Sequence, residues 1–219
     1  MNDQIIVINP NSTEDCTRGI DAAMDSLRMT GGPGIECVTM RDGPPGVESQ
    51  GDSDSVAIPI RDYIKTRDND AGAFVIACFS DPGLHAAREA TRKPVLGIAE
   101  CAYMKAMTMG ERFGVISILE SSVKRHQRYV RQLGVDSRWA GDIAIGLGIV
   151  ELSNEDKVLR HMIGAGERLR DECGADVVVM GCAGMARYRD RLRDALGMPV
   201  VEPSQAAVTQ AIGHIRCDG

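Results

Sequence analysis

Two cysteines occupy matching places in the two halves of this 219-residue chain. Cys78 follows the apolar run 75–77, Cys182 follows 178–181, and each precedes a segment that can begin a helix. A thiol at the carboxyl end of a parallel strand faces the place where open α/β sheets bind ligands. When two such thiols face each other across a cleft, one thiolate removes a proton and the opposite thiol donates one. This pair is the minimal apparatus for inverting a carbon centre without a cofactor.

The chemistry of this cysteine pair depends on the pKa of each thiol. A free cysteine has a pKa of about 8.5, which falls to about 3.5–7.5 near a helix N-terminus. Because Cys78 and Cys182 both precede helix starts, backbone N–H groups and the helix dipole are expected to favour the thiolate. The two groups are expected to titrate as a coupled pair.

Alternating strand and helix signals surround these two cysteines. Strands are predicted at 5–8, 35–40, 73–77, 94–98, 113–118, around 139, 177–180 and 198–201. Helices are predicted at 14–29, 53–66, from about Pro82, 121–133, 154–172, 186–196 and 204–215. The predicted capping residues are Ser12 or Thr13, Ser80 or Asp81, and Ser121 or Ser122. Strands that alternate with helices indicate an α/β fold with parallel sheets and right-handed crossovers.

The two halves show the marks of an internal duplication. Three offsets agree: 182 − 78 = 104 for the cysteines, 113 − 5 = 108 for the strand starts and 199 − 94 = 105 for the prolines. We therefore predict two pseudo-symmetric lobes, each a short, mainly parallel four-stranded sheet flanked by helices. Residues 1–98 with 204–219 form the predicted first lobe, and residues 99–203 form the second.

The composition excludes several classes of partner. A net charge of −6 without a basic stripe argues against nucleic-acid binding. No apolar run approaches the ~20 residues that span a bilayer, so no membrane partner is expected. The first residues lack a basic leader pattern, which favours a cytoplasmic location.

The remaining cysteines and the histidines give no sign of a metal site. The seven cysteines are an odd number, and they form no C-x-x-C pair and no cluster with zinc spacing. Free thiols in a reducing compartment are therefore expected. Five cysteines are interpreted as small buried hydrophobes: Cys16, Cys37, Cys101, Cys173 and Cys217. Four histidines fall within predicted helices and are assigned core or surface roles: His85, His126, His161 and His214.

Four segments together resemble the hydantoin and allantoin racemase branch of the aspartate/glutamate racemase superfamily. They are Ile-Asn-Pro-Asn-Ser-Thr at 8–13, Gly-Pro-Pro-Gly-Val-Glu-Ser at 43–49, Ala-Cys-Phe-Ser-Asp-Pro-Gly-Leu at 77–84 and Gly-Cys-Ala-Gly-Met at 181–185. The resemblance covers nearly the whole chain. It implies an active site in the cleft between the two lobes, Cys78 and Cys182 as the acid/base residues, and a homo-oligomer. It also implies catalysis of a small-molecule reaction without metal, pyridoxal phosphate or nucleotide.

The residues after the cysteines indicate the substrate class. Glutamate and aspartate racemases usually carry Cys-Asn-Thr and Cys-Thr-His-Tyr motifs here, whereas this chain has Cys-Phe-Ser at 78–80 and Cys-Ala-Gly at 182–184. This departure argues against a free amino acid and favours a 5-monosubstituted hydantoin or allantoin. The run 115–118 is more apolar than the branch pattern, which leaves the accepted side chain open.

Removing the C5 proton of such a ring gives an enolate, whose oxygen needs hydrogen-bond donors. The predicted substrate-binding residues lie at strand ends and on one loop: Asn11, Ser12, Phe79, Ser80, Ser117, Ile118, Ala183 and Gly184, with Val47 and Glu48 as possible loop contacts. Asn11 is equally consistent with a role in stabilising the turn. Asp81 is interpreted as a helix cap rather than as a base, and the Glu48 side chain is expected to be solvated rather than to contact the ligand. The loop 42–51 is either a lid or a long connection.

Other functions on the same scaffold stay open at this point. They include an amino-acid racemase, a decarboxylase resembling arylmalonate decarboxylase, an isomerase resembling maleate isomerase, and a hydrolase that uses one cysteine. A non-enzymatic ligand-binding domain is a further alternative.

Overall fold

The computed structural model describes residues 3–217 and contains two four-stranded sheets in which every pairing is parallel. The strands of the first sheet are β1 Gln4–Asn9, β2 Gly34–Thr39, β3 Ala73–Ile76 and β4 Val95–Gly97. Those of the second are β5 Phe113–Ser117, β6 Trp139–Ala144, β7 Val177–Met180 and β8 Val200–Val201. The α/β fold with two four-stranded sheets is thus confirmed, and the sheets are entirely parallel.

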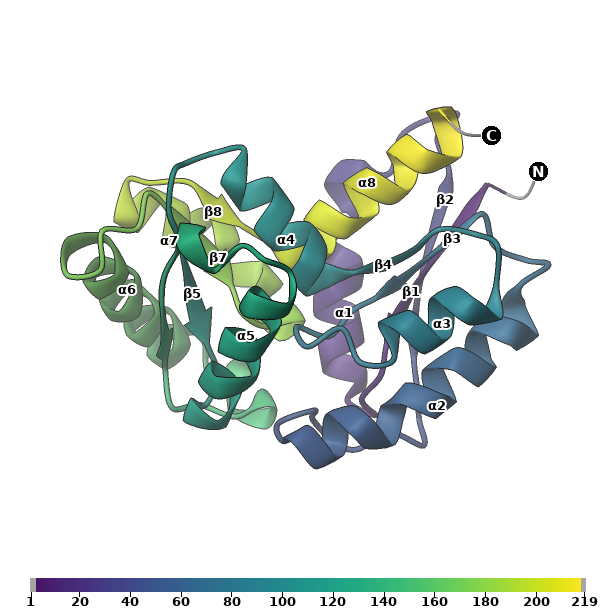
Figure 1. The fold of residues 1–219 in the computed structure, drawn as a ribbon, viewed down its shortest axis with the longest axis horizontal. Helices are drawn as coiled ribbons and strands as arrows, with labels where there is room; N and C mark the ends of the chain where they lie inside the picture. Colours follow the sequence, from purple (N-terminus) through teal and green to yellow (C-terminus); the bar gives the residue numbers. More distant parts are fainter. Residues whose placement is uncertain (1–2, 218–219) are drawn as a thin grey trace.

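Helices cover both faces of each sheet (Figure 1). The α-helices are α1 Glu14–Ala23, α2 Gln50–Arg67, α3 Leu84–Ala90, α4 Ile98–Met107, α5 Glu120–Gln132, α6 Glu155–Asp171, α7 Arg189–Leu196 and α8 Pro203–Cys217. Short 3₁₀ segments are η1 Asp25–Leu27, η2 Asp136–Arg138, η3 Ile149–Ser153 and η4 Ala183–Tyr188. On the first sheet, α2 and α3 pack on one face, and α1 and α8 on the other. On the second, α6 and α7 pack on one face, and α4 and α5 on the other.

The two sheets share one strand order, which agrees with an internal duplication. The orders β2-β1-β3-β4 and β6-β5-β7-β8 are the same when the second half is renumbered from its own first strand. The strands before the two cysteines start 177 − 73 = 104 positions apart, the same offset as the cysteines. Each half therefore places its cysteine at the carboxyl end of its third strand.

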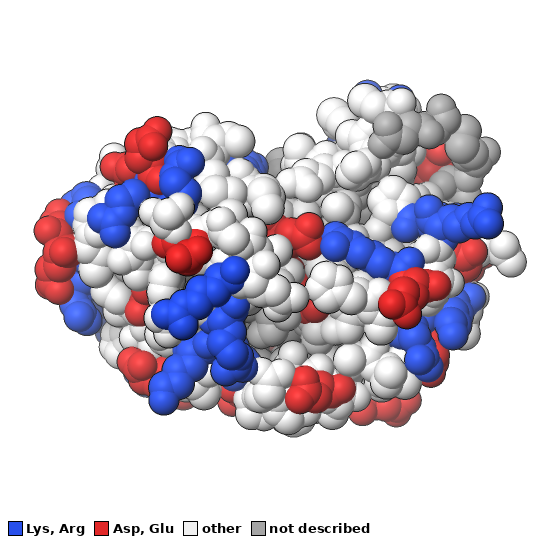
Figure 2. All heavy atoms as spheres, in the orientation of Figure 1, with Lys and Arg blue, Asp and Glu red and all other residues white. Residues whose placement is uncertain are grey.

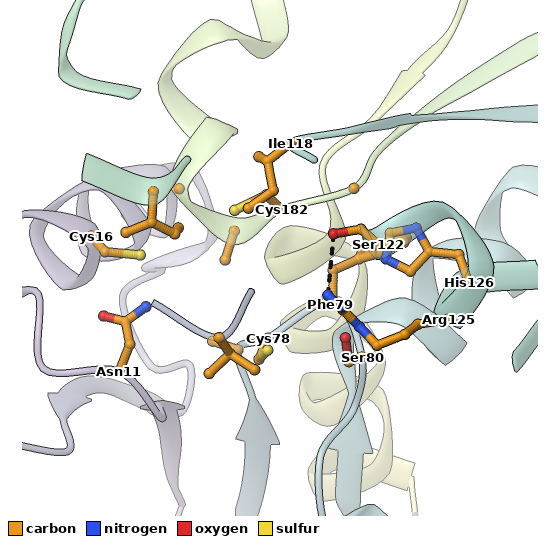
Figure 3. Close-up of a pocket in the computed structure, with 16 residues that line it drawn as sticks. Asn11, Cys16, Cys78, Phe79, Ser80, Ile118, Ser122, Arg125, His126 and Cys182 are labelled. Atoms are coloured by element: carbon orange, nitrogen blue, oxygen red, sulfur yellow. Dashed lines mark hydrogen bonds between the residues drawn. The ribbon is translucent and has the colours of Figure 1, made fainter. Parts of the chain in front are cut away.

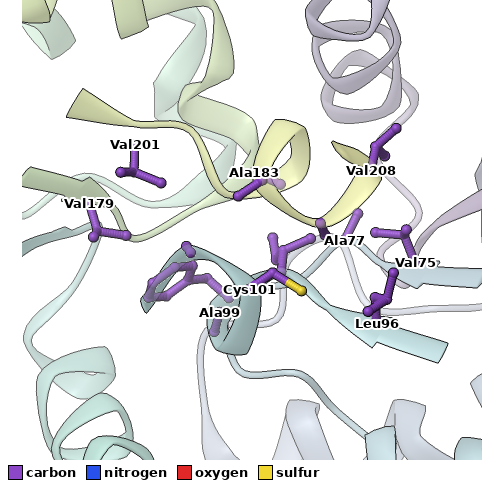
Figure 4. Close-up of a cluster of buried hydrophobic side chains, with 14 of the residues drawn as sticks. Val75, Ala77, Leu96, Ala99, Cys101, Val179, Ala183, Val201 and Val208 are labelled. Carbon is purple, nitrogen blue, oxygen red and sulfur yellow. The ribbon is translucent and has the colours of Figure 1, made fainter. Parts of the chain in front are cut away.

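One apolar cluster passes from the first sheet to the second. It joins Val75 of β3 to Val115 of β5 and Val179 of β7 through the small and apolar residues of α4 and α8. Figure 4 shows Ala99 and Cys101 of α4 between Val179 and Val201 of the second sheet and Val75 and Leu96 of the first. Because this core is shared, the lobe boundary at residue 98 stays a prediction.

Several element ends differ from the sequence-based expectation. Helix α1 ends at Ala23 and tightens into η1, instead of continuing to residue 29. Helix α2 begins at Gln50, because Ser49 and Asp52 form a capping box. The expected side-chain caps before α1 and α5 do not form, since Thr13 donates to the Pro45 carbonyl and Leu119 is the N-cap of α5.

Helix α4 is the one α-helix that sequence reasoning missed. Its cap comes from Asp81, whose carboxylate accepts the backbone N–H groups of Ala99 and Glu100 at 2.9 and 2.8 Å. Asp81 was expected to cap the helix that follows it, but Gly83 is the N-cap of α3 and makes no side-chain cap bond. A cap that lies 18 positions away in the sequence leaves no local signal at the helix start.

Asp81 is expected to contribute strongly to the stability of the fold. It is buried, has a φ of 44° that Asp and Asn tolerate, and also accepts the Tyr129 hydroxyl at 2.9 Å. Burial raises the pKa of its carboxyl to about 7, although the N–H donors of α4 oppose this. Asp81→Asn leaves one helix donor facing an amide NH₂, so we expect a loss of about 1–3 kcal/mol in the free energy of unfolding.

Urea denaturation of the wild type and the Asp81→Asn variant measures this loss. The exposed Asp136→Asn is a matched control and is expected to stay within about 0.5 kcal/mol of the wild type. Equal stabilities of the two variants would show that the remote cap does not contribute.

The surface carries charges of both signs. On the face shown in Figure 2, basic and acidic side chains are interspersed, and a group of basic ones lies over the region of α5.

Among residues 3–217, no helix is both long enough and apolar enough to cross a bilayer.

Candidate active site

A cavity of about 30 Å³ lies where β1, β3, β5 and β7 end, and residues of both halves line it. Nine of the predicted site residues are among its lining: Asn11, Val47, Cys78, Phe79, Ser80, Ile118, Cys182, Ala183 and Gly184. Five side chains that sequence reasoning did not assign also line it: Cys16, Ser122, Arg125, His126 and Ile149. The carboxyl ends of the inner strands of both sheets thus contribute to one site (Figure 3).

The two cysteines enter the cavity from equivalent positions. Cys78 follows β3 and Cys182 follows β7, and their side chains lie on different walls of the cavity in Figure 3. Each thiol has a backbone N–H two residues further along as its hydrogen-bond donor, from Ser80 and from Gly184. The duplication therefore repeats the local environment of the thiol as well as its place in the fold.

The prediction that the helix starts favour the thiolates is wrong for the closed cavity. Burial raises the pKa of the Cys78 thiol to about 12 and raises the pKa of the Cys182 thiol well above its usual range. For Cys78 the nearby Asp81 carboxylate adds to the rise, while the Ser80 N–H and the Arg125 guanidinium lower the pKa. Desolvation outweighs these donors, because Cys182 is buried and Cys78 is half-buried, so that little water solvates a negative charge on either sulfur.

Cys16 is a third thiol of the cavity, although it was interpreted as a buried hydrophobe. It lies on α1 and lines the cavity. Burial raises its pKa to about 11, against a side-chain hydrogen bond from Asn11. Of the others, Cys101 is buried as expected, Cys37 and Cys173 are half-buried, and Cys217 is exposed. All seven cysteines are free.

Asn11 both shapes the turn after β1 and reaches the cavity. Its side-chain oxygen accepts the Thr13 N–H at 2.9 Å and the Asn9 amide at 3.0 Å. The two expected roles of Asn11 are thus compatible. Ser12 does not line the cavity; its N–H donates to the Pro44 carbonyl at 2.9 Å and holds the loop 42–49 against the turn.

Ser117 belongs to a buried polar cluster behind the cavity wall. Its hydroxyl lies 3.0 Å from Nδ1 of His126 and 2.5 Å from a carboxylate oxygen of Asp142. The second carboxylate oxygen of Asp142 lies 2.7 Å from the same ring nitrogen. Ser117 itself does not line the cavity, whereas His126 does, so His126 links this cluster to the site. The core or surface role assigned to His126 is corrected accordingly, and the other three histidines are exposed.

Glu48 fastens the loop of the first half to the second half. Its carbonyl accepts the Ser121 hydroxyl at 2.8 Å and Nη1 of Arg125 at 2.9 Å. Its carboxylate accepts the Ile149 N–H at 2.8 Å. Glu48 does not line the cavity, but these bonds hold the neighbouring Val47 over it. The side chain expected to be solvated or to contact ligand is therefore a latch between the halves.

Two glycines shape the backbone around Cys182. A Cβ on Gly181 would lie 2.7 Å from the Ile116 carbonyl oxygen, so this glycine allows β7 to continue close against β5. A Cβ on Gly184 would lie 3.0 Å from the Leu152 side chain and 3.6 Å from Sγ of Cys182. Gly181 thus serves packing between strands, and Gly184 keeps space beside the thiol.

The cavity offers proton donors and acceptors from side chains and backbone. Within residues 3–217, no group of three or more His, Cys, Asp or Glu side chains has the arrangement of a metal site. Three thiols, the backbone N–H groups beside two of them and the side chains of α5 surround the space. This set can bind a small ring and move protons to and from it.

Comparison with known proteins shows the family of this fold and site. The family model described as Asp/Glu/Hydantoin racemase matches residues 5–211. The chain therefore belongs to the Asp/Glu/hydantoin racemase family, and this membership makes it an isomerase of the racemase class.

Relatives and solved structures agree with this assignment. A hydantoin racemase of Pseudomonas sp. (strain NS671) is 36% identical over 208 residues, which cover 94% of this chain and 83% of that protein. The structure of an allantoin racemase from Klebsiella pneumoniae superposes with a TM-score of 0.88 and 30% identity, and covers 98% of this chain and 88% of its own. An allantoin racemase from Pseudomonas fluorescens gives a TM-score of 0.90 and 27% identity, with coverages of 98% and 92%.

Proposed function

We propose that this protein inverts C5 of a hydantoin-type ring, such as a 5-monosubstituted hydantoin or allantoin. The observation that carries the proposal is the pair Cys78 and Cys182 at equivalent strand ends on one cavity. The similarity to hydantoin and allantoin racemases supports the substrate class.

The proposed mechanism uses the two thiols as interchangeable base and acid. One thiolate removes the C5 proton, and the electron pair of the C–H bond moves into the ring as an enolate. The opposite thiol then donates its proton to the other face of C5 and becomes the thiolate. The enantiomer that enters decides which of Cys78 and Cys182 acts first as the base.

The enolate oxygen requires donors that are already in place, each worth about 3 kcal/mol. The Ser80 and Gly184 N–H groups lower the pKa of the neighbouring thiols, so they are proposed to stabilise whichever sulfur is ionised. The Asn11 side chain and the N–H groups of Phe79 and Ala183 lie on the same cavity and are the proposed donors to the oxygen.

The proposal also covers the cofactor requirement, the location, the oligomeric state and the lobe boundaries of the enzyme. The two thiols supply both proton transfers, so the reaction is proposed to need no metal or organic cofactor. The free cysteines favour a cytoplasmic location. A homo-oligomer is proposed from the family resemblance, and the lobes are proposed to divide at residues 98 and 204.

A single-enantiomer assay in D₂O tests the function. We expect optical rotation to decay to zero, with deuterium entering C5 of the product. Incubation of several 5-substituted hydantoins and of allantoin identifies the preferred ring. No loss of rotation across this panel, with ligand still raising the melting temperature, would indicate a binding protein instead.

A further inference from the structure

Arg125 is a buried cation in the cavity that hydrogen-bonds to no carboxylate, although the carboxylates of Asp52 and Glu48 act on it from outside the cavity lining. It lies on α5 and is 8% exposed. Among the residues that line the cavity it is the one Lys or Arg, and no Asp or Glu lies among them. Burying a charge is costly unless it is paired. The cavity lining therefore carries a positive charge that no acidic residue of the lining balances.

The hydrogen bonds of Arg125 use three of its five N–H donors. Nη1 donates to the Glu48 carbonyl at 2.9 Å and to the Ser121 carbonyl at 3.1 Å, and Nη2 donates to the Ser122 hydroxyl at 3.1 Å. These acceptors are neutral. Nε is buried and has no partner within the described part of the chain. The guanidinium is thus fixed in place by three neutral groups, with an N–H and a charge still available.

The place of the guanidinium in the cavity lining favours a ligand as its partner. Figure 3 shows the Arg125 side chain reaching from α5 towards Ser80 and Cys78. The charge of Arg125 acts on Cys78 and lowers the pKa of that thiol. Val47, Ile118 and Ile149 form an apolar part of the same lining. The cavity is therefore polarised, with its positive end at Arg125.

We propose, on the basis of the function proposed above, that Arg125 binds a carboxylate on the C5 substituent of the substrate. A hydantoin ring with an acidic side chain would place its ring between the thiols and its carboxylate against the guanidinium. Arg is suited to this role because its planar N–H groups bind carboxylates in a fixed geometry. Arg125 is then the residue that determines the specificity of the site.

The test compares three hydantoins whose C5 side chains are equally long and end in a carboxylate, a primary amide or a methyl group. For the wild type we expect kcat/KM for the acid to exceed that for the alkyl compound by about 10- to 100-fold. Arg125→Met is expected to abolish this preference, and Arg125→Lys to retain part of it. Arg128→Met is the matched control, because Arg128 lies on the same helix, is exposed and does not line the cavity.

Two results would overturn the proposal. One is a wild type that prefers the alkyl compound or the amide; the other is an Arg125→Met variant that loses activity equally on all three rings. The second result would mean that Arg125 stabilises the thiolate or the enolate and does not bind a carboxylate of the substrate.

A binding measurement separates this proposal from the proposed function. Calorimetry on the Cys78→Ser variant, with the same three compounds, reports affinity without turnover. Tighter binding of the acid that Arg125→Met removes supports the carboxylate site even if no ring is racemised. Equal affinities for the acid and the alkyl compound count against it, whether or not racemisation is observed.

Discussion

Replacement of Cys78 or Cys182 by serine is expected to lower the rate of racemisation by about 10²- to 10⁴-fold, the usual contribution of a positioned acid or base. The hydroxyl keeps nearly the same volume, but its pKa is far above that of a thiol, so it cannot act as the base. Both residues lie on the same cavity at equivalent strand ends, and the proposed inversion requires both of them. Equal losses are therefore expected for the two variants.

Isotope exchange makes this prediction sharper. Each variant keeps one thiol, which can still remove and return the C5 proton on its own side. In D₂O, Cys78→Ser is expected to exchange one enantiomer without inversion, and Cys182→Ser the other. Exchange of the same enantiomer by both variants, or full racemisation by either, would contradict the two-base mechanism.

Two other cysteines provide controls for these variants. Cys173 is half-buried and lies outside the cavity lining, so Cys173→Ser is expected to behave as the wild type. Cys16 lines the cavity, and Cys16→Ser is expected to retain exchange of both enantiomers. Melting temperatures of all four variants show whether a loss of activity comes from the site or from the fold.

The rate kcat/KM is expected to rise with pH, about tenfold per unit from pH ~6 to ~9. The base of the proposed mechanism is a thiolate, and burial raises the pKa of Cys78 to about 12 and raises that of Cys182 well above its usual range. The thiolate fraction below such a pKa grows tenfold for each unit of pH. The rise ends at the first apparent pKa of the coupled pair, because the second thiol must keep its proton.

Asp81→Asn tests the origin of this profile. The Asp81 carboxylate raises the pKa of Cys78, so its removal is expected to move the rising limb to lower pH. Initial rates with one enantiomer, measured in buffers of constant ionic strength, give the profile. A rate that is flat or falls over this range would mean that the reacting thiolate already exists at neutral pH.

The sequence predicted most of the fold because its signals are local. Strand runs such as 73–77 and 177–180 are apolar and end in turn residues, and the repeat of 104 positions related the two halves. Helix α4 could not be predicted in this way, because its cap, Asp81, comes from another part of the chain. The latch role of Glu48 is also nonlocal, since its partners Ser121 and Arg125 lie more than 70 positions away.

The candidate site was predicted where it depends on strand ends, and missed where it depends on a helix face. Cys78 and Cys182 follow strands directly, so their place at the cavity came from topology. Ser122, Arg125 and His126 are spaced three and four residues apart, which places them on one face of α5. This spacing, in a helix that begins after the end of β5, is the sequence signal that indicates a shared position for the three side chains.

The Glu48 latch has a consequence for how tightly the protein holds its ligand. The cavity of this conformation has room for about two water molecules, so we expect a ring to enter when Glu48 releases its hydrogen bonds to α5 and η3. Only the open fraction of molecules then takes up ligand, and the apparent Kd is the intrinsic Kd divided by that fraction. Contacts that keep water from a reactive intermediate thus weaken uptake. The apparent Kd of both enantiomers rises by the same factor, because opening precedes any discrimination between them. The equilibrium ratio of the two enantiomers, which have equal free energy, is unchanged.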